Sequence, residues 1–89
     1  MINQSDKNKI VNYAKKYKIK EVYLFGSSLD SIKKSNDIDI GIKGISPLSF
    51  FDFYGKLLRN LSKPVDIVNL SKKNRLNKLI EQDSIKIYG

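Results

Sequence analysis

The feature that most constrains the fold is a strict alternation of side chains in the segment NDIDIGIKG, residues 36–44. Isoleucines stand at every second position from Ile38 to Ile42. Asp37 directly precedes the first isoleucine, and Asp39 lies between the first and the second. A period of two predicts a β-strand with one buried face. Two carboxylates on the other face of that strand repel each other unless a partner neutralises them. The segment therefore predicts a strand whose polar face needs a cation.

Composition limits the chemistry that the chain can perform. Its 89 residues predict a single domain spanning 1–89. The sequence contains no Cys and no His, which excludes a disulfide framework, a thiolate nucleophile and a Ser-His-Asp triad. Catalysis would therefore rest on carboxylates, hydroxyls, lysines or a hard metal ion.

Helical and strand-like periods alternate along the sequence. Ser5 and Ser71 are expected to cap the first and last helices, and Ser46-Pro47 to begin the middle one. The phenylalanines at 50–53 are expected in the core, with an interface as the minor alternative. Strands are expected at Ile19–Phe25, Asn36–Gly44, Val65–Leu70 and, at an edge, Ser84–Gly89. The order predicts an α/β (α+β) fold, a small mixed β-sheet with helices packed on it.

A third carboxylate follows in the strand-like segment VDIVNL, where Asp66 stands between Val65 and Ile67. If that strand pairs beside the alternating one, Asp66 joins Asp37 and Asp39. Carboxylates on neighbouring strands can hold two magnesium ions, the arrangement that promotes phosphoryl or nucleotidyl transfer.

A candidate phosphate cradle precedes the carboxylates, at the end of the strand-like segment IKEVYLF. Gly26 lets the backbone approach a ligand closely, and Ser27 and Ser28 offer hydroxyl donors. Separately, a Gly-Ser pair is usually a turn and D-x-D is often a solvated edge. The ordered combination is more specific than its parts.

That ordered pattern, LFGSS, NDIDI and VDIV, resembles the nucleotidyltransferase superfamily of DNA polymerase beta. It is most similar to the minimal nucleotidyltransferases (MNT) that act as antitoxins in HEPN/MNT toxin–antitoxin systems. By this resemblance Gly26, Ser27 and Ser28 bind the nucleotide, and Asp37 and Asp39 bind metal. Asp66 supplies the third carboxylate, which completes the metal site or helps to deprotonate the acceptor hydroxyl.

The resemblance implies a Mg²⁺-dependent nucleotidyltransferase with two ions at the nucleotide. It would transfer AMP from ATP, or a nucleotidyl group from another nucleoside triphosphate, to a HEPN-type toxin. The chain departs from the family at Asp30-Ser31, where a basic residue followed by Gly is usual. That departure supports the alternative of a catalytically weak or inactive antitoxin that neutralises its partner by direct binding.

The net charge of +8 raises a third interpretation, nucleic-acid binding. We do not favour direct nucleic-acid binding, because only two of the 17 basic residues are arginine and the lysines are scattered. No apolar run approaches the roughly 18 residues of a membrane span. The sequence is therefore expected to be that of a soluble, cytoplasmic protein.

Overall fold

The computed structural model describes residues 2–26 and 37–89. The described elements follow in the order α1 (Gln4–Lys16), β1 (Glu21–Leu24), β2 (Ile38–Lys43), α2 (Pro47–Asn60), β3 (Val65–Asn69), α3 (Arg75–Gln82) and β4 (Ile85–Tyr88). This confirms the predicted order of helices and strands. Each strand is shorter than the segment expected from its side-chain pattern.

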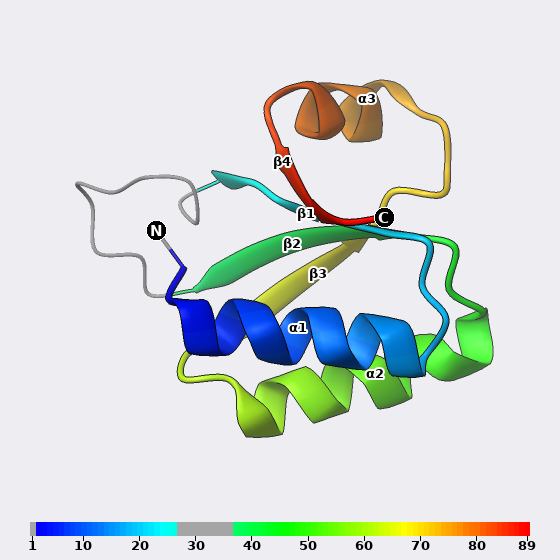
Figure 1. The fold of residues 1–89 in the computed structure, drawn as a ribbon. Coiled ribbons are helices and arrows are strands. Elements are labelled where there is room, and N and C mark those ends of the chain that lie inside the picture. The colour runs from blue at the N-terminus through cyan, green and yellow to red at the C-terminus, as the bar shows by residue number, and fades with distance from the viewer. Residues whose placement is uncertain (1, 27–36) are drawn as a thin grey trace.

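The four strands form one mixed sheet in the order β3-β2-β1-β4. Strand β1 is antiparallel to both of its neighbours, whereas β2 and β3 are parallel and α2 connects them. Helices α1 and α2 lie side by side on one face of the sheet, and α3 lies on the other (Figure 1). The predicted α/β (α+β) fold is therefore confirmed, and β4 is the expected edge strand.

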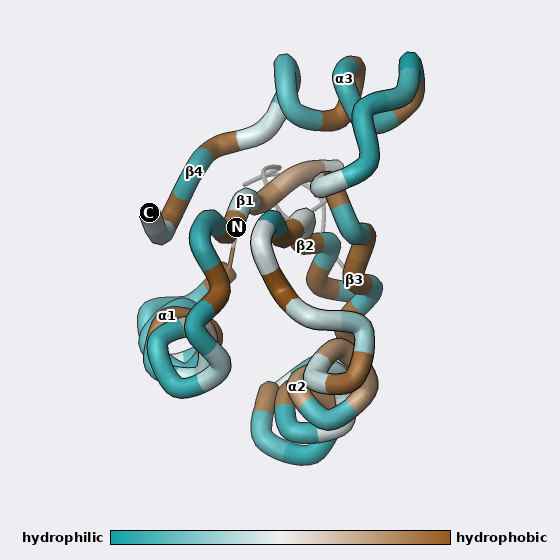
Figure 2. The backbone as a smooth tube through the Cα atoms, turned by 90° about the vertical axis from the view of Figure 1, so that its right-hand side faces the viewer, coloured by the Kyte–Doolittle hydropathy of each residue, from teal (hydrophilic) through white to brown (hydrophobic). Residues whose placement is uncertain are grey.

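The core lies between the sheet and the α1/α2 layer. The isoleucines of β2 are at most 3% exposed, as the alternation predicted, and they pack with residues from both helices. Hydrophobic and hydrophilic stretches alternate along α1 and α2 (Figure 2), the pattern of helices that bury one face. The fully buried side chains of largest volume are those of Phe53, Ile10, Ile40, Ile42, Leu57 and Val22.

The ends of the first two helices follow from side-chain capping. Helix α1 is capped by Asn3, whose Oδ1 accepts a 2.7 Å hydrogen bond from the backbone N–H of Asp6. The prediction of Ser5 as this cap was wrong by two residues. The helix begins at Gln4, so Ser5 lies inside it and Asn3 is the residue whose side chain accepts from a free amide of the first turn. Ser46 caps α2 and Pro47 is its first residue, as predicted.

Asp6 is buried and accepts a hydrogen bond from the backbone N–H of Ser62, which ties α1 to the α2–β3 connection.

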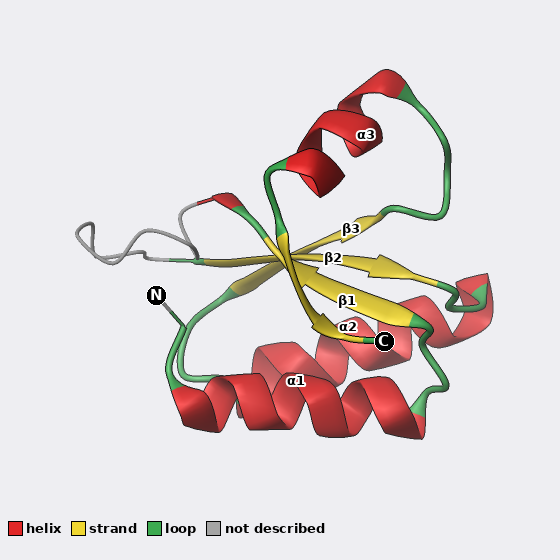
Figure 3. Ribbon diagram, turned by 45° about the horizontal axis from the view of Figure 1, so that its top comes forward, coloured by secondary structure: helices red, strands yellow, loops and turns green. Residues whose placement is uncertain are grey.

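Helix α3 stands apart from the α1/α2 layer, across the sheet (Figure 3). Its cap is Asn74, not the predicted Ser71, whose hydroxyl instead accepts a hydrogen bond from the backbone N–H of Gly44. Asn77 is buried and donates to the carbonyls of Asn69 and Lys72. These bonds hold the start of α3 to the chain that leaves β3.

The phenylalanines of α2 do not share one environment. Phe53 is fully buried, but Phe51 is 80% exposed, so the expectation that both belong to the core was wrong for Phe51. The two residues are separated by 200° around a helix, and the four-stranded sheet covers only one side of α2. None of the helices in the described ranges has the length and apolar character that a bilayer crossing requires.

Candidate functional site

The parallel pairing of β2 and β3 places two of the predicted carboxylates opposite each other. Asp39 and Asp66 are register partners, between the buried pair Ile38–Val65 and the pair Ile40–Ile67. Paired residues on adjacent parallel strands point to the same face, about 4.8 Å apart at the backbone. Because the isoleucines of β2 face the α1/α2 layer, both carboxylates lie on the opposite face. The expectation that β3 pairs beside β2 is confirmed.

Gly26, two residues beyond the end of β1, lies against the Asp39 carboxylate. Its φ of 63° lies in the left-handed region, and a Cβ built on it would stand 2.7 Å from Oδ2 of Asp39. The backbone N–H of Phe25 donates to the carbonyl of Asp39, which fixes the two segments against each other. Glycine is therefore required here on two counts, its backbone conformation and the closeness of the Asp39 carboxylate.

Three further residues were predicted to belong to the site, and the structure describes one of them, Asp37. Asp37 is exposed and directly precedes β2, two residues before Asp39. Ser27 and Ser28 fall outside the described residues, so their predicted role in nucleotide binding stays a prediction. The structure thus brings together Gly26, Asp39 and Asp66, with Asp37 adjacent in the chain.

The donors at this end of the sheet suit a hard cation. Carboxylate oxygens are the ligands that Mg²⁺ prefers, and it normally takes one or two of them together with phosphate oxygens and water. Asp39 and Asp66 supply such a pair, and the space that a Cβ of Gly26 would fill lies against one of them. Within the described ranges, no group of three acidic or histidine side chains forms a ready metal cluster.

A second polar group lies on the same face at the far end of β2, and sequence patterns did not reveal it. Lys43 forms a 2.6 Å ion pair with Glu81 of α3, and the Tyr23 hydroxyl donates to Glu21 at 2.6 Å. Burial and the Glu21 carboxylate raise the pKa of Tyr23 above its usual value. The same hydrogen bond lowers the pKa of Glu21. The ion pair between Lys43 and Glu81 fastens the end of α3 to the sheet, away from Asp39 and Asp66.

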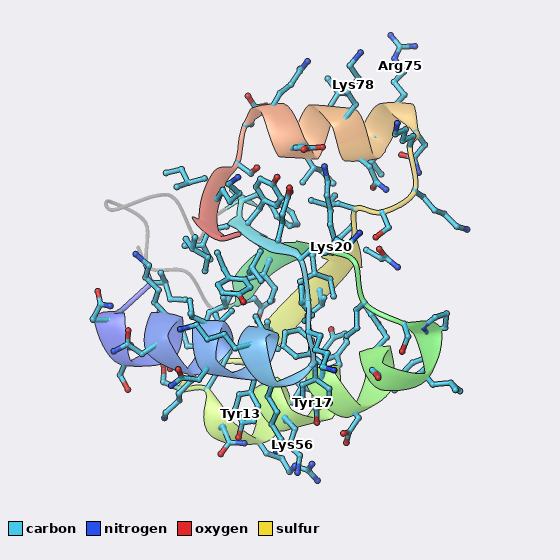
Figure 4. All side chains as sticks on the ribbon, turned by 45° about the vertical axis from the view of Figure 1, so that its right-hand side comes forward. Tyr13, Tyr17, Lys20, Lys56, Arg75 and Lys78 are labelled. Carbon is cyan, nitrogen blue, oxygen red and sulfur yellow. The ribbon has the colours of Figure 1, made fainter. Side chains whose placement is uncertain are left out.

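Among the residues that the structure describes, the basic side chains of α2 and α3 labelled in Figure 4 do not converge on the carboxylates. Arg75 and Lys78 project from α3 away from the sheet, while Lys56 extends from α2 on the opposite side of the molecule (Figure 4). Lys20 lies in the connection between α1 and β1. This arrangement agrees with the scattered distribution expected from the sequence.

The fold and this strand-end pair of carboxylates define a nucleotidyltransferase-type domain. The profile of the family "Polymerase beta, Nucleotidyltransferase" matches residues 8–89, and the chain belongs to that family. The resemblance inferred from LFGSS, NDIDI and VDIV is thereby confirmed. No curated protein sequence matches the chain.

Several solved structures share the fold. One is a toxin-antitoxin crystal structure with AMP-PNP, with a TM-score of 0.77 and 24% identity, covering 93% of this chain and 73% of the other. Another is the toxin-antitoxin MntA-HepT, with a TM-score of 0.74 and 22% identity over 98% and 73% of the two chains. A third is the tri-AMPylated Shewanella oneidensis HEPN toxin in complex with MNT antitoxin, with a TM-score of 0.75 and 23% identity over 99% and 73%.

Proposed function

We propose that this chain is a Mg²⁺-dependent nucleotidyltransferase that transfers AMP from ATP to a HEPN-type toxin and thereby acts as its antitoxin. The observation that carries the proposal is the register pairing of Asp39 with Asp66 beside the backbone of Gly26. A carboxylate pair next to the backbone of a glycine suits a metal-bound triphosphate. Membership of the nucleotidyltransferase family supports the class of reaction.

The predicted site residues would have two kinds of role, binding of the metal-bound nucleotide and transfer of a proton. Gly26, Ser27 and Ser28 would hold the triphosphate, and Asp37, Asp39 and Asp66 would hold Mg²⁺. When bound, the metal would neutralise charge on the phosphate oxygens. The acceptor hydroxyl oxygen forms a bond to the α-phosphorus while the bond from that phosphorus to the β-phosphate breaks, releasing pyrophosphate. Asp66, the more exposed of the paired carboxylates, would either complete the metal site or help to accept the hydroxyl proton.

The identity of the acceptor rests on the structural neighbours. One neighbour is an MNT antitoxin bound to a tri-AMPylated HEPN toxin, and another complex contains AMP-PNP. Asp66 is exposed, and α3 is held to the sheet by the ion pair between Lys43 and Glu81 at the other end of β2. A macromolecular acceptor could therefore approach Asp66 directly.

Transfer is tested with ATP radiolabelled at the α-phosphate and a HEPN-type toxin encoded beside this chain. The wild type should label the toxin in the presence of Mg²⁺, and Asp39→Asn should abolish labelling while the circular dichroism spectrum stays unchanged. Asp83→Asn, an exposed carboxylate at the end of α3, is the matched control and should label normally. Undiminished labelling by Asp39→Asn would refute the proposed role of the pair.

A second function is neutralisation by binding alone. The acidic Asp30 in the segment between Gly26 and Asp37 favours it, because a negative charge there opposes triphosphate binding. The double variant Asp37→Ala/Asp39→Ala separates the two functions. Protection of cells by that variant, at normal abundance, would favour binding over transfer, and loss of protection would favour transfer.

A further inference from the structure

Helix α2 carries an exposed apolar stripe on the side turned away from the core. The outer stripe consists of Leu48, Phe51, Gly55 and Leu58, whose spacing of three, four and three residues is that of a helix–helix seam. Leu48 is 94% exposed, Phe51 80% and Leu58 51%, whereas Phe53 and Leu57 on the inner side are fully buried. Helix α2 is therefore apolar on two sides, and this molecule covers only one.

Exposure alone does not single out this stripe, because Leu76 and Leu79 of α3 are also exposed. The distinguishing residue is Gly55, in the middle of α2. A Cβ built on it would meet no atom closer than Nη2 of Arg59, at 3.9 Å, so none of the described residues requires glycine there. Glycine inside a helix is destabilising relative to alanine. Without a side chain at Gly55, the surface of α2 is low at this position, and a second helix can approach its backbone closely.

The charges beside the stripe are self-complementary. Asp52 precedes Gly55 by three residues and Arg59 follows it by four. The Asp52 carboxylate also accepts a hydrogen bond from the Tyr17 hydroxyl of α1, which leaves its second oxygen for a contact with another copy. If two copies of α2 cross antiparallel about a twofold axis near Gly55, Asp52 of each copy faces Arg59 of the other. The same axis sets Leu58 beside the second copy's Phe51. A twofold contact makes each of these pairings twice.

We propose that the outer stripe of α2 is a self-association surface, on which a second copy of this chain docks through an antiparallel α2–α2 contact centred on Gly55. The stripe is on the helical layer, and Asp39 and Asp66 lie on the opposite face of the sheet. The dimer contact therefore lies on the other side of the sheet from the carboxylate pair of each copy. The contact does not depend on nucleotidyl transfer.

The wild-type chain, free of any partner, should show a concentration-dependent rise to twice the single-chain mass in sedimentation equilibrium. Leu58→Gln should weaken dimerisation about tenfold or more, because the change is present twice in a twofold contact. Leu79→Gln is the matched control, since Leu79 is exposed to the same 51% on α3, and it should leave dimerisation unchanged. Equal effects of the two substitutions would overturn the proposal.

Gly55→Gln gives a second, independent test. Glutamine is the better helix former, so the variant should unfold at the same or a higher temperature than the wild type. Its side chain fills the crossing point, so dimerisation should weaken by at least the same factor as in Leu58→Gln. A single-chain mass for the wild type throughout a series reaching high-micromolar concentration would overturn the proposal. If Leu58→Gln instead weakened binding of a HEPN-type toxin and the wild type stayed monomeric, the stripe would be the binding surface for that toxin. That result would also overturn the proposal.

Discussion

The backbone of Gly26 lies directly against the carboxylate of Asp39, close enough that a Cβ on residue 26 would stand 2.7 Å from Oδ2. The end of β1 and the polar face of β2 therefore meet at the proposed site. This contact links the two halves of the proposed function, a turn that approaches phosphates and a carboxylate that binds their metal. Asp66, the register partner of Asp39, completes the described part of the site.

The first prediction concerns Gly26→Ala. The added methyl group displaces the Asp39 carboxylate, and a misplacement of about 1 Å can lower a reaction rate about 100-fold. We expect transfer to fall by that order, measured as labelled toxin per minute. The left-handed backbone should also cost about 1–2 kcal/mol of unfolding free energy.

Gly44→Ala is the control that distinguishes a loss of transfer caused by displacing Asp39 from one caused by backbone strain alone. Gly44 also has a positive φ, 81°, and a Cβ there would press on the Lys20 side chain, far from the carboxylates. This variant should lose comparable stability in urea titrations but keep its transfer rate. An equal loss of activity in both variants would show that backbone strain alone, and not the Asp39 contact, lowers transfer.

The second prediction compares two phenylalanines of α2. Phe53→Ala removes a fully buried ring and should cost about 3–5 kcal/mol of unfolding free energy. Phe51→Ala, at 80% exposure, should change the stability of the single chain by no more than about 0.5 kcal/mol. Chemical denaturation in dilute solution measures both. Similar costs at the two positions would contradict the orientation of α2.

The third prediction is a pH dependence at the Tyr23–Glu21 hydrogen bond. That bond lowers the pKa of Glu21 below its usual 4.5, so its stabilising effect is complete above pH 4.5 and is lost as the pH falls through the folded-state value. At neutral pH, Tyr23→Phe should destabilise the fold by about 1 kcal/mol. The difference in unfolding free energy between wild type and variant should shrink as the pH falls below 4.5. A difference that stays constant from pH 7 to pH 3 would argue against this pairing.

Local patterns in the sequence were sufficient to predict the strand faces. The alternation around Asp39 reflects a physical period of two, and the structure buries the isoleucines and leaves Asp39 on the opposite face. The sequence did not determine whether β3 pairs beside β2, so the pairing of Asp66 with Asp39 could not be predicted outright. The register of these strands depends on how α2 returns the chain to the sheet. The roles of Ser27 and Ser28 remain predictions.

Other features depend on contacts that a sequence pattern does not contain. Asn3 and Asn74 cap their helices in place of the expected serines, since several polar residues near a helix start can reach its free amides. Phe51 is apolar but exposed, because burial depends on how much of α2 the sheet covers. The ion pair between Lys43 and Glu81 joins residues far apart in the chain.

The measurement that tests the central claim most directly is isothermal titration of the protein with AMP-PNP, with and without Mg²⁺. It is made on the wild type, Asp39→Asn and the control Asp83→Asn. The account predicts Mg²⁺-dependent binding to the wild type and to Asp83→Asn, and none to Asp39→Asn. Binding of equal strength to Asp39→Asn, or binding that does not need Mg²⁺, would contradict the claim that the Asp39–Asp66 pair forms the metal-nucleotide site.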